Sequence, residues 1–145
     1  MYSQNAYFIL HTFSITLSYI VFWVASAAAA AYLIQDNYLK HKKTGILFNR
    51  LPDLSFLDKL IYRSIGLGFP LLTVSIISGF GQEMNLHGCY WQNYNSRQIY
   101  ALVLWLLYAV ILHVRLSEKL RGRKVAILSL LAFFVTILSL FSACH

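Results

Sequence analysis

The chain has 145 residues, of which 59% are hydrophobic and only 12% are charged. Ordinary soluble domains are about 45–50% apolar and about 25% charged, so a water-soluble fold of this length could not bury so much apolar surface. The net charge of +7 does not indicate a nucleic-acid partner, because the cations form neither an aromatic-interleaved groove nor a recognition helix.

Four apolar segments are long enough to cross a bilayer, which takes about 20 predominantly apolar residues. They cover residues of about 7–34, 61–80, 99–114 and 125–143. The third is the shortest, and it reaches spanning length if Gln98 and Arg115 lie at the interfaces, where an arginine can snorkel. The sequence therefore predicts an all-α polytopic membrane protein, with residues 1–145 forming one membrane domain of four transmembrane helices.

The basic residues predict the orientation of these helices. Eleven of the twelve lie in or beside two alternate loops, 35–60 and 115–124, and only Arg97 lies in the loop 81–98. The positive-inside rule assigns the two basic loops to the cytoplasm, so the N-terminus, the loop 81–98 and the C-terminus are predicted outside. The first span is too long for a cleaved signal peptide and lacks a basic region before it. We expect an integral protein of the bacterial inner (cytoplasmic) membrane.

Small or helix-breaking residues occur in the first two spans. Residues 25–31 are alanines apart from Ser26, which gives a smooth surface for a helix of the same chain or of a partner subunit. Gly66, Gly68 and Pro70 predict a bent or locally unwound second span, for packing or for function. Residues 51–61 predict a short interfacial helix leading into it.

Two histidines lie within the predicted spans. His113, near the cytoplasmic end of the third span, is costly at membrane depth unless it is paired, hydrogen-bonded or ligating. It is either an interface histidine bonded to a carbonyl or water, or an axial heme ligand. His11, near the outer end of the first span, has the same two interpretations. Bilayer dimensions put the two about 25–30 Å apart, so they cannot both ligate one iron.

The other polar groups offer little for catalysis. His87 and His145 are predicted outside, and His41 lies in a basic run and is expected to be solvated. The chain has no HxxxH, HExxH or CxxC spacing, which disfavours a zinc site. The outer loop has Glu83 as its one acid, so paired-carboxylate catalysis has no second group there. Whether the chain takes part in an enzyme is left open, and by itself it is not expected to be one.

The predicted outer side carries both cysteines and many aromatic residues. Cys89 and Cys144 could form a disulfide in an oxidising compartment, unless their Cα atoms lie too far apart. The aromatic residues form either an interfacial belt or a flat face for a porphyrin. They are Tyr90, Trp91, Tyr94 and Tyr100, with Trp105 one turn deeper.

Several stretches together resemble the CcsA/ResC/HemX-like cytochrome c assembly family. They are LPDL at 51–54, LDKLIYR at 57–63, LGFPLLT at 67–73, LWLLY at 104–108, LHVRL at 112–116 and RGRK at 121–124. The residues YLIQ at 32–35 and Leu39-Lys40 fit the same pattern. The resemblance covers nearly the whole chain but only the C-terminal half of the family.

The resemblance implies a role in handling heme within the membrane. Members of that family carry heme to the outer surface for attachment to apocytochrome c, and they hold it with histidines and a tryptophan-rich loop. By position His113 matches the intramembrane histidine of the family, and His11 matches its first external histidine. The expected second external histidine falls beyond the end of this chain, and His145 is out of register with it.

The loop departs from the family pattern. Trp91 is retained, Tyr94 and Tyr100 stand where the family has tryptophan, and Asn95 and Gln98 stand where it has Asp and Glu. These replacements are similar in shape but uncharged.

Two hypotheses follow. In the first, the protein binds heme b through His113, with a second ligand from another membrane subunit or a second copy, and through His11 outside. It would then assist a cytochrome c heme lyase or synthetase, with apocytochrome c as a further partner and lipid around it. In the second, it is a degenerate relative that serves as a structural or regulatory subunit of a membrane complex and binds no heme.

Overall fold

The computed structural model describes residues 2–42, 45–87, 96–117 and 122–144, and nearly all of these residues lie in helices. The helices are α1 (Tyr2–Lys40), α2 (Ile46–Arg50), α3 (Leu54–His87), α4 (Ser96–Leu116) and α5 (Arg123–Cys144). The described ranges contain no strand, so the predicted all-α class is confirmed.

Four of these helices are long and apolar enough to cross a membrane, as the sequence predicts. The candidate spans are Asn5–Lys40, Leu54–Gln82, Gln98–Leu116 and Arg123–Phe141. Large apolar side chains cover the outside of the bundle, among them Phe13, Ile77 and Phe134, each exposed by more than 60%. Such a surface is stable against lipid tails and not against water. The chain is an integral membrane protein.

Helices α1 and α3 are longer than the spans predicted within them. Helix α3 runs without interruption from Leu54 to His87, so residues 54–61 form its first turns and not a separate interfacial helix. It also continues through Pro70, so the second span is not unwound there. Hydropathy sets the membrane-crossing part of a helix, but the backbone can continue to hydrogen-bond within itself beyond the bilayer.

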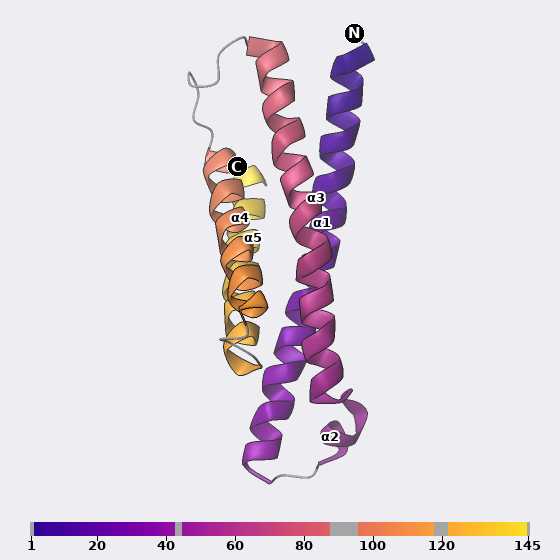
Figure 1. The fold of residues 1–145 in the computed structure, drawn as a ribbon, viewed down its shortest axis with the longest axis vertical. Coiled ribbons are helices and arrows are strands. Elements are labelled where there is room, and N and C mark those ends of the chain that lie inside the picture. The colour runs from indigo at the N-terminus through magenta and orange to yellow at the C-terminus, as the bar shows by residue number, and fades with distance from the viewer. Residues whose placement is uncertain (1, 43–44, 88–95, 118–121, 145) are drawn as a thin grey trace.

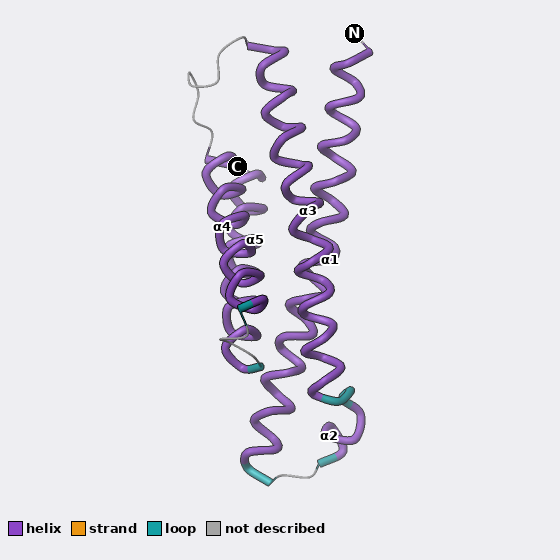
Figure 2. The backbone as a smooth tube through the Cα atoms, viewed as in Figure 1, coloured by secondary structure: helices purple, strands orange, loops and turns teal. Residues whose placement is uncertain are grey.

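The four long helices form a closed antiparallel bundle. Helix α3 packs along α1 over the most extensive contact, α5 also packs against α1, and α4 packs against both α5 and α3. Figure 1 shows α1 and α3 as a long pair with the shorter α4 and α5 beside them. The backbone trace places both ends of the chain at one end of the bundle and α2 at the other (Figure 2).

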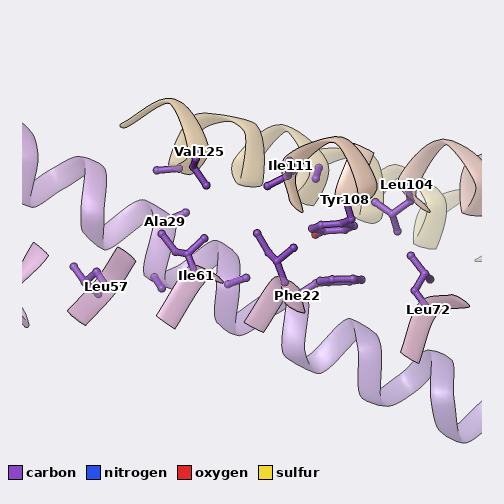
Figure 3. Close-up of a cluster of buried hydrophobic side chains, with 14 residues drawn as sticks. Phe22, Ala29, Leu57, Ile61, Leu72, Leu104, Tyr108, Ile111 and Val125 are labelled. Carbon is purple, nitrogen blue, oxygen red and sulfur yellow. The ribbon is translucent and has the colours of Figure 1, made fainter. Parts of the chain in front are cut away.

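Phe22 of α1 and Tyr108 of α4 stack across the centre of this bundle. Their ring centroids are 3.7 Å apart and the ring planes differ by 6°. Both rings are buried, at 0% and 1% exposed, and Figure 3 shows them between Leu72, Leu104 and Ile111. A Cβ at Gly68 of α3 would overlap the Phe22 ring, so only glycine leaves room for it.

Small residues let the helices approach closely around this core. Ala25, Ser26, Ala28 and Ala29 are all buried inside the bundle, so much of the alanine run serves packing within the chain. Buried hydroxyls are satisfied by a carbonyl one turn back, for example Thr136 Oγ1 donating to Ala132 O at 2.9 Å. Hydroxyls such as this one are therefore paired within their own helix.

Candidate functional site

The predicted outer end of the bundle brings His11 of α1 against α3. His11 Nδ1 lies 2.7 Å from the backbone oxygen of Ser75 and 3.3 Å from Ser75 Oγ. The His11 side chain is half-buried, whereas Ser75 is 1% exposed. A carbonyl oxygen can only accept, so this contact places the ring hydrogen on Nδ1 and leaves Nε2 with the lone pair.

Gly79 of α3 makes room for the His11 ring. A Cβ at this position would lie 3.1 Å from both Cε1 and Nδ1 of His11, tighter than ordinary van der Waals contact. Two residues further along α3, a Cβ at Gly81 would lie 3.4 Å from the Tyr7 ring, which is an ordinary contact. The close approach of α1 to α3 at this level therefore depends on Gly79.

Trp105 of α4 lies beside the middle of α3. Its indole Nε1 donates to Thr73 Oγ1 at 2.9 Å, and its ring stacks on Phe69 at a centroid distance of 5.5 Å. Tyr100, one turn and a half nearer the start of α4, is half-buried. Of the aromatic residues that the sequence singles out, Trp105 is thus held against the middle of α3.

Other predicted site residues lie outside the described part of the chain. Cys89, Trp91 and Tyr94 fall within 88–95, and His145 is likewise undescribed. Cys144 is the last residue of α5, where only the backbone is described. The predicted disulfide and the role of the loop aromatics therefore remain predictions.

His113 lies near the other end of the bundle, in the last turns of α4, with its side chain exposed. Its backbone oxygen accepts a hydrogen bond from Ser117 Oγ at 2.9 Å. Two residues on, Arg115 contacts Asp58 at the start of α3, while His11 contacts Ser75 of the same helix. Seventeen residues of α3, about 25 Å of helix, separate those two contacts. The structure keeps the two histidines apart, and one iron cannot join them within a single chain.

A charged cluster at the His113 end was not singled out from the sequence. Arg115 binds both carboxylate oxygens of Asp58, with Nη1 at 2.7 Å from Oδ1, and its guanidinium lies 5.6 Å from the Tyr62 ring centroid. Asp36 lies 3.1 Å from Lys40 Nζ, and Arg123 Nη1 lies 3.8 Å from the same carboxylate oxygen. The sequence did contain a signal for this cluster, because Asp36 and Asp58 each lie beside a predicted membrane boundary. The Arg115–Asp58 pair joins α3 to α4, the Arg123–Asp36 pair joins α1 to α5, and the Lys40–Asp36 pair lies within α1.

The same end holds a cavity lined by Tyr32, Leu54, Ser55, Asp58 and Gly122. Gly122 has a φ of +70°, and a Cβ there would lie 2.5 Å from the Tyr32 hydroxyl, so glycine is required for two reasons. Among the residues that the structure describes, no three His, Cys, Asp or Glu side chains gather as a metal site. The arrangement instead offers single imidazoles, which suit an axial position on a heme iron.

Comparison with known proteins gives one family. The family model described as cytochrome c assembly protein matches residues 2–144. Among curated relatives, the cytochrome c biogenesis protein CcsA of Chlamydomonas reinhardtii is 35% identical over 91% of this chain. The CcsA of Guillardia theta is 33% identical over 91% of it, and that of a Synechococcus species is 42% identical over 63%.

This chain spans only part of the length of those relatives. The matched part is 36% of the Chlamydomonas protein, 48% of the Guillardia protein and 26% of the Synechococcus protein. The comparison with solved structures found no match.

Proposed function

Because the chain belongs to the cytochrome c assembly protein family, we propose that it handles heme in the membrane and assists cytochrome c biogenesis. The observation that carries this proposal is the match along residues 2–144, which confirms the resemblance seen in the sequence. The relatives are named as cytochrome c biogenesis proteins, and this chain has the membrane helices that such a role requires. The heme-free structural subunit is the less supported alternative.

His11 is the proposed ligand at the outer face. Its Nδ1 is bonded to a backbone carbonyl 2.7 Å away, so the neutral ring keeps the Nε2 lone pair that an iron accepts. The residue is half-buried, so it is not sealed within the core of the bundle. Trp91, Tyr94 and Tyr100 are proposed to face the porphyrin, on the strength of their place in the sequence.

His113 is the proposed ligand at the other end. Its exposed side chain on α4 supports a site completed by a ligand from another membrane subunit or a second copy of this chain. Heme b fits both histidines, because a neutral imidazole is a usual axial ligand of its iron. What the protein itself supplies is position: the helices hold each imidazole at a fixed depth, and transfer to apocytochrome c would take place outside with a lyase partner.

The bacterial inner membrane is the proposed location. A Synechococcus protein is among the relatives, and the basic residues favour one side of the bundle. Lys40 of α1, Arg115 of α4 and Arg123 of α5 lie at one end of the bundle, where they pair with Asp36 and Asp58.

Visible spectroscopy tests the proposal. We expect the protein purified in mild detergent with added hemin to give a Soret band and sharp reduced α and β bands. His11→Ala or His113→Ala should remove or shift these bands, whereas His41→Ala, an exposed histidine of the basic segment, should not. A colourless wild-type protein after hemin addition would contradict the proposal and favour the heme-free subunit.

A further inference from the structure

The hydrogen bond that holds His11 comes from the backbone of α3 and not from a side chain. The carbonyl of Ser75 is one turn from Gly79, and in an α-helix it also accepts the N–H of residue 79. Ser78 Oγ lies 3.0 Å from the same oxygen but nearer, at 2.8 Å, to the carbonyl oxygen of Val74, so its one hydrogen can go to Val74 and leave the Ser75 oxygen to His11. Ser75 is 1% exposed, so this acceptor is fixed within the packed part of the bundle.

The position of Gly79 determines whether the ring can reach that carbonyl. The atoms that a Cβ would crowd, Cε1 and Nδ1, belong to the ring edge that makes the 2.7 Å bond. A methyl group there would displace the ring by a few tenths of an ångström and lengthen the bond. Cε1 also lies between the two nitrogens, so the displacement would move Nε2 as well.

Glycine at this point is unfavourable for the helix alone. Within a helix, glycine is about 1 kcal/mol less favourable than alanine. Gly66 of the same helix has open space where its Cβ would be, so alanine would be accepted there. At Gly79, by contrast, the absence of a side chain allows the close contact with His11.

We propose that Gly79 and the Ser75 carbonyl are positioning residues that hold His11 as the Nδ1–H tautomer, with Nε2 ready to bind iron. The iron-binding role of Nε2 rests on the proposed function, whereas the positioning of the His11 ring does not. Ligating histidines commonly donate their second N–H to a carbonyl, which fixes the ring and raises the basicity of the ligating nitrogen. Here glycine provides the space and the helix provides the acceptor.

The geometry is tested first without heme. We would label histidine with ¹⁵N, assign the His11 signals by their loss in His11→Ala, and record the nitrogen shifts at pH 8, where a histidine of ordinary pKa is neutral. The expected result is the Nδ1–H tautomer in the wild type, a mixture of tautomers in Gly79→Ala, and no change in Gly66→Ala. Mainly Nε2–H tautomer in the wild type, or an unchanged Gly79→Ala spectrum, would overturn the proposal.

Hemin titration of the same variants separates this inference from the proposed function. We expect Gly79→Ala to weaken the His11-dependent spectrum about 10-fold in hemin affinity, with Gly66→Ala like the wild type. If the wild type binds no hemin while the tautomer result holds, heme handling fails and the positioning of His11 stands. If hemin binds through His11 and Gly79→Ala binds it equally well, the positioning role is wrong.

Discussion

Two rings of α1 meet glycines of α3, in surroundings that differ. Phe22 lies on Gly68 at the centre, fully buried, with Tyr108 of α4 stacked on it. His11 lies on Gly79 nearer the end of the bundle, half-buried, with a backbone carbonyl as its polar partner. Eleven residues, about three turns, separate the rings on α1 and likewise the glycines on α3, so both contacts belong to one antiparallel register.

The difference shows how one packing arrangement can serve two purposes. A Cβ at Gly68 would overlap the Phe22 ring, which Tyr108 prevents from moving away. A Cβ at Gly79 would lie 3.1 Å from His11, so a small shift of the ring could accommodate it. We therefore expect the central contact to contribute mainly to stability, and the outer contact to the orientation of an imidazole.

Removing each ring should give the largest contrast. Phe22→Ala should lower the free energy of unfolding by about 4 kcal/mol, because it leaves a cavity in a fully packed centre. His11→Ala should lower it by about 1 kcal/mol, the usual net contribution of a hydrogen bond. SDS titration of the detergent-solubilised protein, followed by far-UV circular dichroism, measures both. Similar losses of unfolding free energy in the two variants would contradict the distinction between a stabilising central contact and an orienting outer contact.

A methyl group added at the central glycine should have the next largest effect. Gly68→Ala should lower the free energy of unfolding by about 3 kcal/mol, because neither the Phe22 ring nor the α3 backbone can move without cost. Gly66→Ala is the matched control, with nothing within 4 Å of its Cβ, and should raise stability by up to about 1 kcal/mol. The same SDS titration compares them, and equal effects would show that the contact is not rigid.

Part of this arrangement could be predicted from the sequence. Hydropathy identified the four spans, and the depth of His11 and His113 followed from their places within them. The contact between His11 and Gly79 could not be predicted, because it depends on the register between α1 and α3, to which no local pattern corresponds. The length of α3 was also missed, since a helix satisfies its own backbone beyond the bilayer.

The polar contacts of α4 show the same limit. Arg115 was expected to snorkel toward water, and its length allowed that prediction. The structure gives it a carboxylate instead, Asp58, which lies on another helix and 57 residues away in sequence. Charge pairing across helices requires the fold to be known first.

The Arg115 pair offers a test at the end of the bundle remote from His11. Arg115→Leu should lower the free energy of unfolding by about 2 kcal/mol, because it leaves the Asp58 carboxylate without its bidentate partner. Lys40→Leu removes a cation whose side chain is 53% exposed, and should change stability by less than about 0.5 kcal/mol. The hemin spectrum of His11 should be unchanged in both variants. Equal losses of unfolding free energy in the two variants would mean that the bidentate Arg115–Asp58 pair contributes no more than a surface ion pair.

The smallest expected effect concerns Trp105, which packs beside the middle of α3. Trp105→Phe retains a ring to stack on Phe69 but loses the 2.9 Å bond to Thr73, and should lower the free energy of unfolding by about 1 kcal/mol. A double-mutant cycle with Thr73→Val should recover most of that loss as coupling, and zero coupling would show that the bond is not formed. Thr73 and Ser75 are two residues apart, about 200° around the helix, so they face different neighbours. The tautomer of His11 should therefore be the same in Trp105→Phe as in the wild type, because α3 holds the imidazole on one side independently of the indole on the other.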